Sequence, residues 1–140
     1  MAAATKQRLT TTKGKGRFER NKMAASVKIW AGTLVMEDSA GYMRPATDTA
    51  GAQGVRGLSV ETVDNTGAAG AKTILYEAGH RVKMTGQSLT QALQGTRLTV
   101  VDDQTVGIPA NTTNDVFAGT LDEFISSTEC WLFVGKEFQA

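Results

Sequence analysis

Short runs of β-branched, aliphatic and aromatic residues recur along the chain from Val27 onward, and turn-forming residues separate them. Runs of this length, bounded by Gly, Asn, Asp and Ser, are typical of β-strands. One run alternates strictly, with Val82 and Met84 on one face and Arg81 and Lys83 on the other, as in a half-buried strand. The pattern predicts strands over residues 27–31, 33–37, 55–63, 72–77, 80–85, 97–101, 116–120 and 129–134.

The last of these runs is apolar on both faces. Cys130, Leu132 and Val134 alternate with Trp131 and Phe133. A strand of this kind is buried on both sides or faces a neighbouring subunit.

One segment has the pattern of a helix. Ser88 and Gln91 have the spacing of a capping box, three apolar residues between 89 and 93 follow at helical spacing, and Gly95 can end the helix. The sequence therefore predicts a mainly β protein, a small β-barrel or β-sandwich with one short helix.

Residues 1–26 differ from the rest and predict an extended or disordered basic N-terminal arm, followed by one β domain over residues 27–140. The arm holds few aliphatic residues, too few to offset the entropy of ordering it. Residues 1–28 carry eight basic side chains and one acidic one, a net of +7, whereas the remaining residues carry a net of −6. The basic residues are Lys6, Arg8, Lys13, Lys15, Arg17, Arg20, Lys22 and Lys28.

This charge division bears on the partners of the chain. An acidic body argues against a uniformly basic nucleic-acid-binding domain. Only Phe18 lies within the arm to stack on bases, so an acidic protein surface is the favoured partner of the arm and nucleic acid is disfavoured. No run approaches the roughly 20 apolar residues of a membrane span.

Candidate catalytic groups are few, and we expect no enzyme activity, metal or cofactor. The only histidine, His80, has a carboxylate in Glu77 but no second histidine, and an ordinary surface or hairpin position is expected for it. Cys130 is expected to be a small buried side chain. Asp102 and Asp103 are expected in a solvated turn, since adjacent residues do not converge on one site.

From Val27 onward the order of strands and turns resembles the capsid cement, or head decoration, proteins of tailed bacteriophages. The resemblance covers roughly residues 27–135. It rests on the opening 27–35 strand, the 41–46 and 55–60 segments, the strand and turn over 95–106, the segment 118–121 and the closing strand 130–134.

This resemblance implies a virion protein, made in the host cytoplasm, that binds the outside of the head where major-capsid subunits meet, as a homodimer or homotrimer. The basic arm would then grip neighbouring subunits, with Phe18, Trp30, Trp131, Phe133 and Phe138 as interface anchors. The alternatives are another virion component, a head-completion or tail-tube protein, and a nucleic-acid-binding module that acts through its arm.

Overall fold

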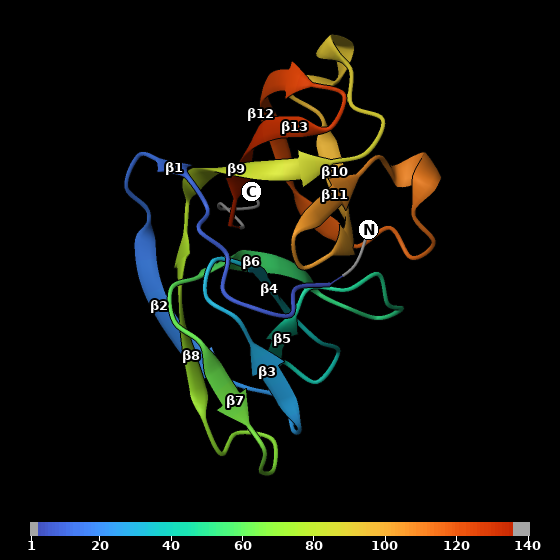
Figure 1. Ribbon diagram of the computed structural model, residues 1–140. Coiled ribbons are helices and arrows are strands. Elements are labelled where there is room, and N and C mark those ends of the chain that lie inside the picture. The colour runs from blue at the N-terminus through green and yellow to red at the C-terminus, as the bar shows by residue number, and fades with distance from the viewer. Residues whose placement is uncertain (1–2, 136–140) are drawn as a thin grey trace.

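The computed structural model describes residues 3–135 of the 140-residue chain. Its strands form a closed barrel and a separate sheet that packs against it (Figure 1). The prediction of a mainly β fold with a small barrel is confirmed. No helix in the described part of the chain is long and apolar enough to cross a membrane.

Five strands close the barrel in the ring order β9-β11-β10-β12-β13, and β13 pairs with β9 again to complete it. Neighbours in the ring are antiparallel except for β9 and β11. Inward side chains from all five strands are buried, because each strand alternates between the barrel interior and its outer surface. The strands are β9 (His80–Gly86), β10 (Arg97–Asp102), β11 (Thr105–Gly107), β12 (Phe117–Ser126) and β13 (Glu129–Val134).

The second sheet has the order β2-β8-β6-β4-β5, and a two-stranded ribbon, β3 and β7, packs against one of its faces. Strand β4 is apolar on both sides for this reason: Leu34 and Met36 belong to the core shared with the barrel, and Val35 to the core shared with the ribbon. The strands are β2 (Arg17–Lys22), β3 (Val27–Ile29), β4 (Leu34–Glu37), β5 (Met43–Pro45), β6 (Gly54–Ser59), β7 (Val63–Asn65) and β8 (Thr73–Ala78).

The predicted solvated arm is not what the structure shows. Strand β1 (Thr12–Lys13) pairs with β9, and β2 pairs with β8 over all six of its residues. Just after β2, Met23 is fully buried. The prediction of disorder is wrong for these residues, because an edge strand is held by backbone hydrogen bonds to its neighbour and needs little apolar burial of its own.

The short helix is also different from the prediction. Only a 3₁₀ turn forms, η1 (Gln91–Leu93), and no side chain caps it. Ser88 has a positive φ of 56° and therefore does not act as the cap. A second 3₁₀ turn, η2 (Pro109–Asn111), was not expected, nor were the three-residue strands β5 and β11, which are too short to show a period in the sequence.

Candidate interaction surface

The basic residues predicted as a binding arm are spread over several elements. Lys6 and Arg8 lie in the coil before β1, Lys13 lies in β1 and Lys28 in β3. Lys15 lies between β1 and β2, and the other three lie on β2, at the edge of the second sheet. The structure therefore does not bring them together as one continuous arm.

Several of these cations pair with carboxylates of the chain itself. These are exposed pairs, and each contributes little to stability, typically about 0–1 kcal/mol. They nevertheless mean that carboxylates of the chain itself already neutralise part of the basic segment. The pairs are Lys13 with Glu123 (3.4 Å), Arg17 with Glu19 (2.9 Å) and Arg20 with Glu61 (3.3 Å).

Residues 4–11, which we call the strap, lie across the junction between the barrel and the second sheet (Figure 1). On the barrel side, the Ala4 amide donates to Asp103 Oδ1 (2.8 Å), and Lys83 donates its amide to the carbonyl of Thr11 (2.8 Å). On the sheet side, the Arg8 amide donates to the carbonyl of Ala31 (2.9 Å). Hydrogen bonds rather than apolar contacts hold the strap.

The Arg8 side chain points from the strap toward the barrel. Its Nη1 donates to Thr10 Oγ1 (3.2 Å) and lies 3.3 Å from Met84 Sδ. Burial lowers the pKa of Arg8 from its usual value, and the charges of Asp102 and Asp103 oppose that effect. Arg8 therefore compensates buried carboxylates inside the chain and is not a free grip for a partner.

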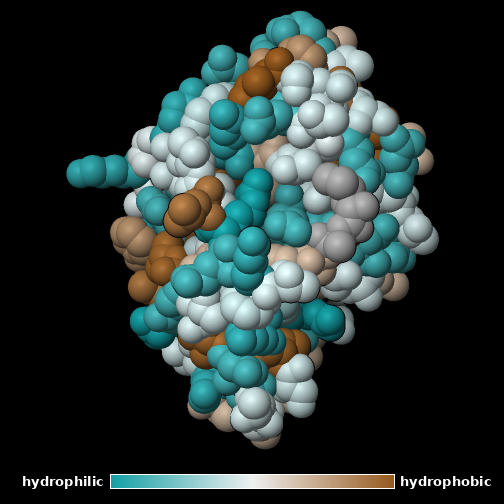
Figure 2. Space-filling view, in the orientation of Figure 1, coloured by the Kyte–Doolittle hydropathy of each residue, from teal (hydrophilic) through white to brown (hydrophobic). Residues whose placement is uncertain are grey.

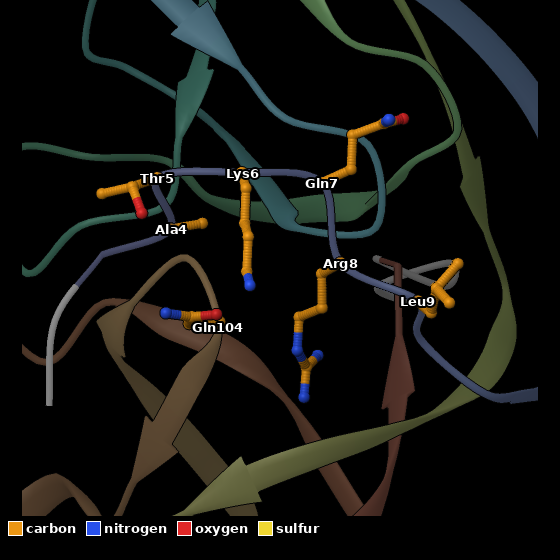
Figure 3. Close-up of a pocket in the computed structure, with 7 residues that line it drawn as sticks. All are labelled: Ala4, Thr5, Lys6, Gln7, Arg8, Leu9 and Gln104. Atoms are coloured by element: carbon orange, nitrogen blue, oxygen red, sulfur yellow. The ribbon is translucent and has the colours of Figure 1, made fainter.

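A hollow of about 410 Å³ lies under the strap, lined by residues 4–9 and Gln104. Figure 3 shows the Lys6 and Arg8 side chains extending from the strap on the same side, Lys6 toward Gln104, while Gln7 points the other way. Lys6 is exposed and forms no ion pair with a described residue.

The aromatic residues predicted as anchors lie partly under the chain's own cations. The Trp30 ring lies 4.0 Å from Lys28 Nζ, and the Trp131 ring lies 4.2 Å from Lys13 Nζ. Phe133 is likewise half-buried on the outer face of β13. A cation over an aromatic face is a favourable arrangement, so these rings are not bare contact surfaces. Phe138 lies outside the described residues.

Phe18 is different, because its side chain is 63% exposed at the start of β2. Two further exposed apolar residues, Leu9 (102%) and Val60 (40%), line a second groove of about 380 Å³ together with Glu77. Phe18 pairs in register with Glu77, so its side chain stands beside this groove. Figure 2 shows apolar side chains gathered at the left of this face, where β2 lies in Figure 1.

We call Leu9, Phe18 and Val60 with this groove the apolar rim. Large apolar side chains that gather at the surface are typical of interaction sites. The sequence analysis missed Leu9 and Val60, because a single apolar residue in coil carries no periodic signal. It also did not foresee that the strap would lie beside β6 and β8.

His80 was expected at an ordinary surface or hairpin position, and Asp102 and Asp103 were expected in a solvated turn. Both predictions are wrong. The His80 side chain is fully buried; its Nε2 lies 3.5 Å from Glu77 Oε1, and burial lowers its pKa. Glu77 Oε2 also accepts the amide of Gly16 (2.9 Å), so it ties the start of β2 to this corner. His80 lines neither the hollow under the strap nor the groove beside Phe18.

Asp103 is only 1% exposed, and Asp102 is 8% exposed. Burial raises the pKa of Asp103, while the hydrogen bond from Ala4 lowers it. The strap covers this turn, which explains why a sequence with typical turn residues ends in a buried site. Cys130 is buried, as predicted, and burial raises its pKa to about 12.

Within residues 3–135, no three His, Cys, Asp or Glu side chains gather into a possible metal site. Neither a protein-family model nor a curated protein matches the sequence. The apolar rim and the neighbouring edge of β2 are the candidate site that the described residues define best.

Proposed function

We propose that this chain is a structural virion protein, a capsid cement protein that binds the outside of a phage head where major-capsid subunits meet and stabilises the shell. The proposal draws on the resemblance over residues 27–135 and on the small β-barrel fold. In this proposal the chain acts as a homodimer or homotrimer, with the major capsid protein as its partner.

The observation that carries the proposal is the apolar rim. Leu9 of the strap and Val60 after β6 line one groove, and Phe18 of β2 stands beside it through its pairing with Glu77. Covering this surface contributes about 25 cal/mol per Å² of apolar area. A ligand that binds only the assembled shell stabilises that shell by mass action, and repetition over a symmetric lattice adds avidity.

A head-binding assay tests the proposal. Expanded, undecorated heads assembled from the major capsid protein of the same genome are mixed with the purified chain. We expect saturable binding and a higher rupture temperature of the heads. Phe18→Ser is expected to weaken binding, whereas Ile125→Ser, which removes an apolar residue with 39% exposure on β12, is the matched control.

Electron microscopy of the decorated heads tests the location. Density over the capsid faces supports a cement protein. Density restricted to the neck or the tail, or heads that bind no chain and rupture at an unchanged temperature, contradicts it.

A further inference from the structure

Strand β2 is the outermost strand of the second sheet. In Figure 1 it lies at the left margin of the molecule, with β8 on its inner side. Among the described residues, no named strand pairs with its other side, but directly after β2 Met23 forms a parallel bridge with Met43 of β5, so this edge is open only over the first part of the strand. An edge strand can accept a further strand by backbone hydrogen bonds along the stretch that is unpaired.

The pairing with β8 determines which backbone groups face this free edge. The Met23 amide donates to the carbonyl of Lys72 at the end of the ladder, and bonded and non-bonded residues alternate along an antiparallel pair. Every second residue before Met23 therefore also forms backbone hydrogen bonds with β8, and these are the odd-numbered residues of β2. Phe18, Arg20 and Lys22 therefore direct their amide and carbonyl groups away from β8. Those of Phe18 and Arg20 face the open edge, whereas Lys22 lies beside the bridge between Met23 and Met43.

The side chains of β2 determine which kind of strand is favoured beside it. The strand carries three cations and one acid, Glu19. Lys22 makes no ion pair with any residue of the described chain, and Arg20 has only an exposed pair with Glu61. An incoming strand places its side chains directly opposite these residues, where opposite charges are favourable and like charges are not.

A second copy of β2 does not fit this edge. The outward backbone groups of two antiparallel copies can bond in three central registers. Arg20 lies opposite Arg20 in the first, Glu19 lies opposite Glu19 in the second, and Arg20 lies opposite Lys22 in the third. Each of these registers sets like charges against one another. The charges on β2 therefore disfavour self-pairing and favour an acidic strand.

We propose that the free edge of β2 binds an extended acidic segment of a partner protein as an added antiparallel strand. Read along that segment, an acid opposite Arg20 and an apolar residue opposite Phe18 form the paired part. A further acid two residues earlier, beyond the paired part, lies toward the exposed side chain of Lys22 and completes the pattern acid-x-acid-x-apolar. The apolar residue lies at the apolar rim. The inference rests on the proposed function, since it names the chemistry of the capsid segment that is bound.

A synthetic peptide tests the edge without any capsid. The probe is a fluorescein-labelled peptide with the core Glu-Thr-Glu-Thr-Val, and the control peptide has Lys in place of both Glu residues. Fluorescence anisotropy is expected to show binding of the acidic peptide alone. Amide hydrogen exchange at Phe18 and Arg20 is expected to slow when it binds. Equal binding of both peptides, or unchanged exchange at these amides, overturns the proposal.

Variants separate the backbone from the charge. Arg20→Gln removes the charge, and Arg20→Pro also removes an amide that faces the free edge and not β8. We expect the first to weaken peptide binding a few-fold and the second by a further factor of about ten, the value of roughly one hydrogen bond. Lys28→Gln, an exposed cation on β3, is the control and leaves binding unchanged. Equal affinity of Arg20→Gln and Arg20→Pro, with both variants folded, overturns strand addition.

Hydrogen exchange on the head-bound chain distinguishes the two proposals. Binding to heads with slowed exchange over residues 17–22 supports both. Binding with unchanged exchange there overturns the strand addition and leaves the cement function intact. If the chain does not bind heads, the cement function fails, and the peptide experiment still decides whether β2 accepts an acidic strand.

Discussion

Gly32 packs directly against the backbone carbonyl of Arg8, with no space for a β-carbon between them. The contact is where the strap crosses the second sheet, and Thr10 Oγ1 donates to the carbonyl of Gly32 (2.6 Å) beside it. Gly32 also has a positive φ of 81°. The absence of a side chain at Gly32 therefore allows both the left-handed backbone conformation and the close packing of the strap backbone.

Gly32→Ala is expected to displace the strap and destabilise the fold. The positive φ alone costs about 1 kcal/mol, and the overlap with Arg8 adds to it. Urea unfolding measures the loss, and hydrogen exchange at Lys83, whose amide bonds to Thr11, reports the displacement.

Gly95→Ala is the matched control, because Gly95 has nearly the same φ, 82°, and nothing within 4 Å of its would-be β-carbon. It is expected to cost only the backbone term, with Lys83 exchange unchanged. Equal losses in the two variants would show that the strap does not depend on Gly32.

Asp103 gives the fold a defined pH dependence. Burial raises its pKa above the usual 3.8, so the folded state binds more protons than the unfolded state between the two values. Stability from this group therefore falls as pH rises through that window and is recovered in acid.

Asp103→Asn keeps an oxygen for the Ala4 amide and removes the charge. We expect a higher unfolding free energy than wild type at pH 7, and no such gain below pH 3.8, measured by urea titration at both values. Asp122→Asn, at an exposed pair with Arg81, is the control. A variant less stable than wild type at neutral pH contradicts the prediction.

Tyr76 links the second sheet to β2 through its hydroxyl, which donates to Glu19 Oε1 (2.9 Å) and accepts from Asn21 Nδ2 (2.6 Å). Tyr76→Phe is expected to cost about 1–3 kcal/mol, since it leaves partly buried polar groups without a partner. Thermal unfolding checks this. Tyr42→Phe, whose hydroxyl bonds to no described residue, is expected to change stability by less than about 0.5 kcal/mol. Similar losses in both would contradict a role for the Tyr76 hydroxyl.

Cys130 reports opening of the barrel. Its thiol is buried and its pKa is raised to about 12, so little thiolate exists at pH 8. We expect no reaction with Ellman's reagent in the native protein and complete reaction in urea. Ser127→Cys, at an exposed position, combined with Cys130→Ser, is expected to react at once. Rapid native labelling of Cys130 would show that the barrel opens readily.

The hydrophobic pattern alone predicted much of the barrel. The alternation of Val82 and Met84 placed β9 correctly, and the apolar positions of β13 are buried as expected on one face. The other face of β13 could not be judged from sequence. Lys13, which covers Trp131, lies more than a hundred residues away along the chain, and only the fold brings them together.

The N-terminal segment shows the limit most clearly. Its composition predicted a solvated arm. In the structure, a deletion of residues 1–25 would remove β1, β2 and the buried Met23, and would therefore alter the fold itself. Local composition predicts only how much apolar surface a segment can bury. An edge strand such as β2 is instead stabilised by backbone hydrogen bonds to its neighbour, and that neighbour, β8, is remote in sequence.

By itself the sequence determined the fold class, most of the strands, and the division of charge between the first 28 residues and the rest, because side-chain period and composition are local properties. The tertiary structure alone decided that β9 receives both β1 and β11 on one edge, that Asp103 and His80 are buried, and that the apolar rim stands beside β2. These features depend on which distant strands pair and which surfaces the pairing covers, and those long-range contacts leave no periodic trace in the chain.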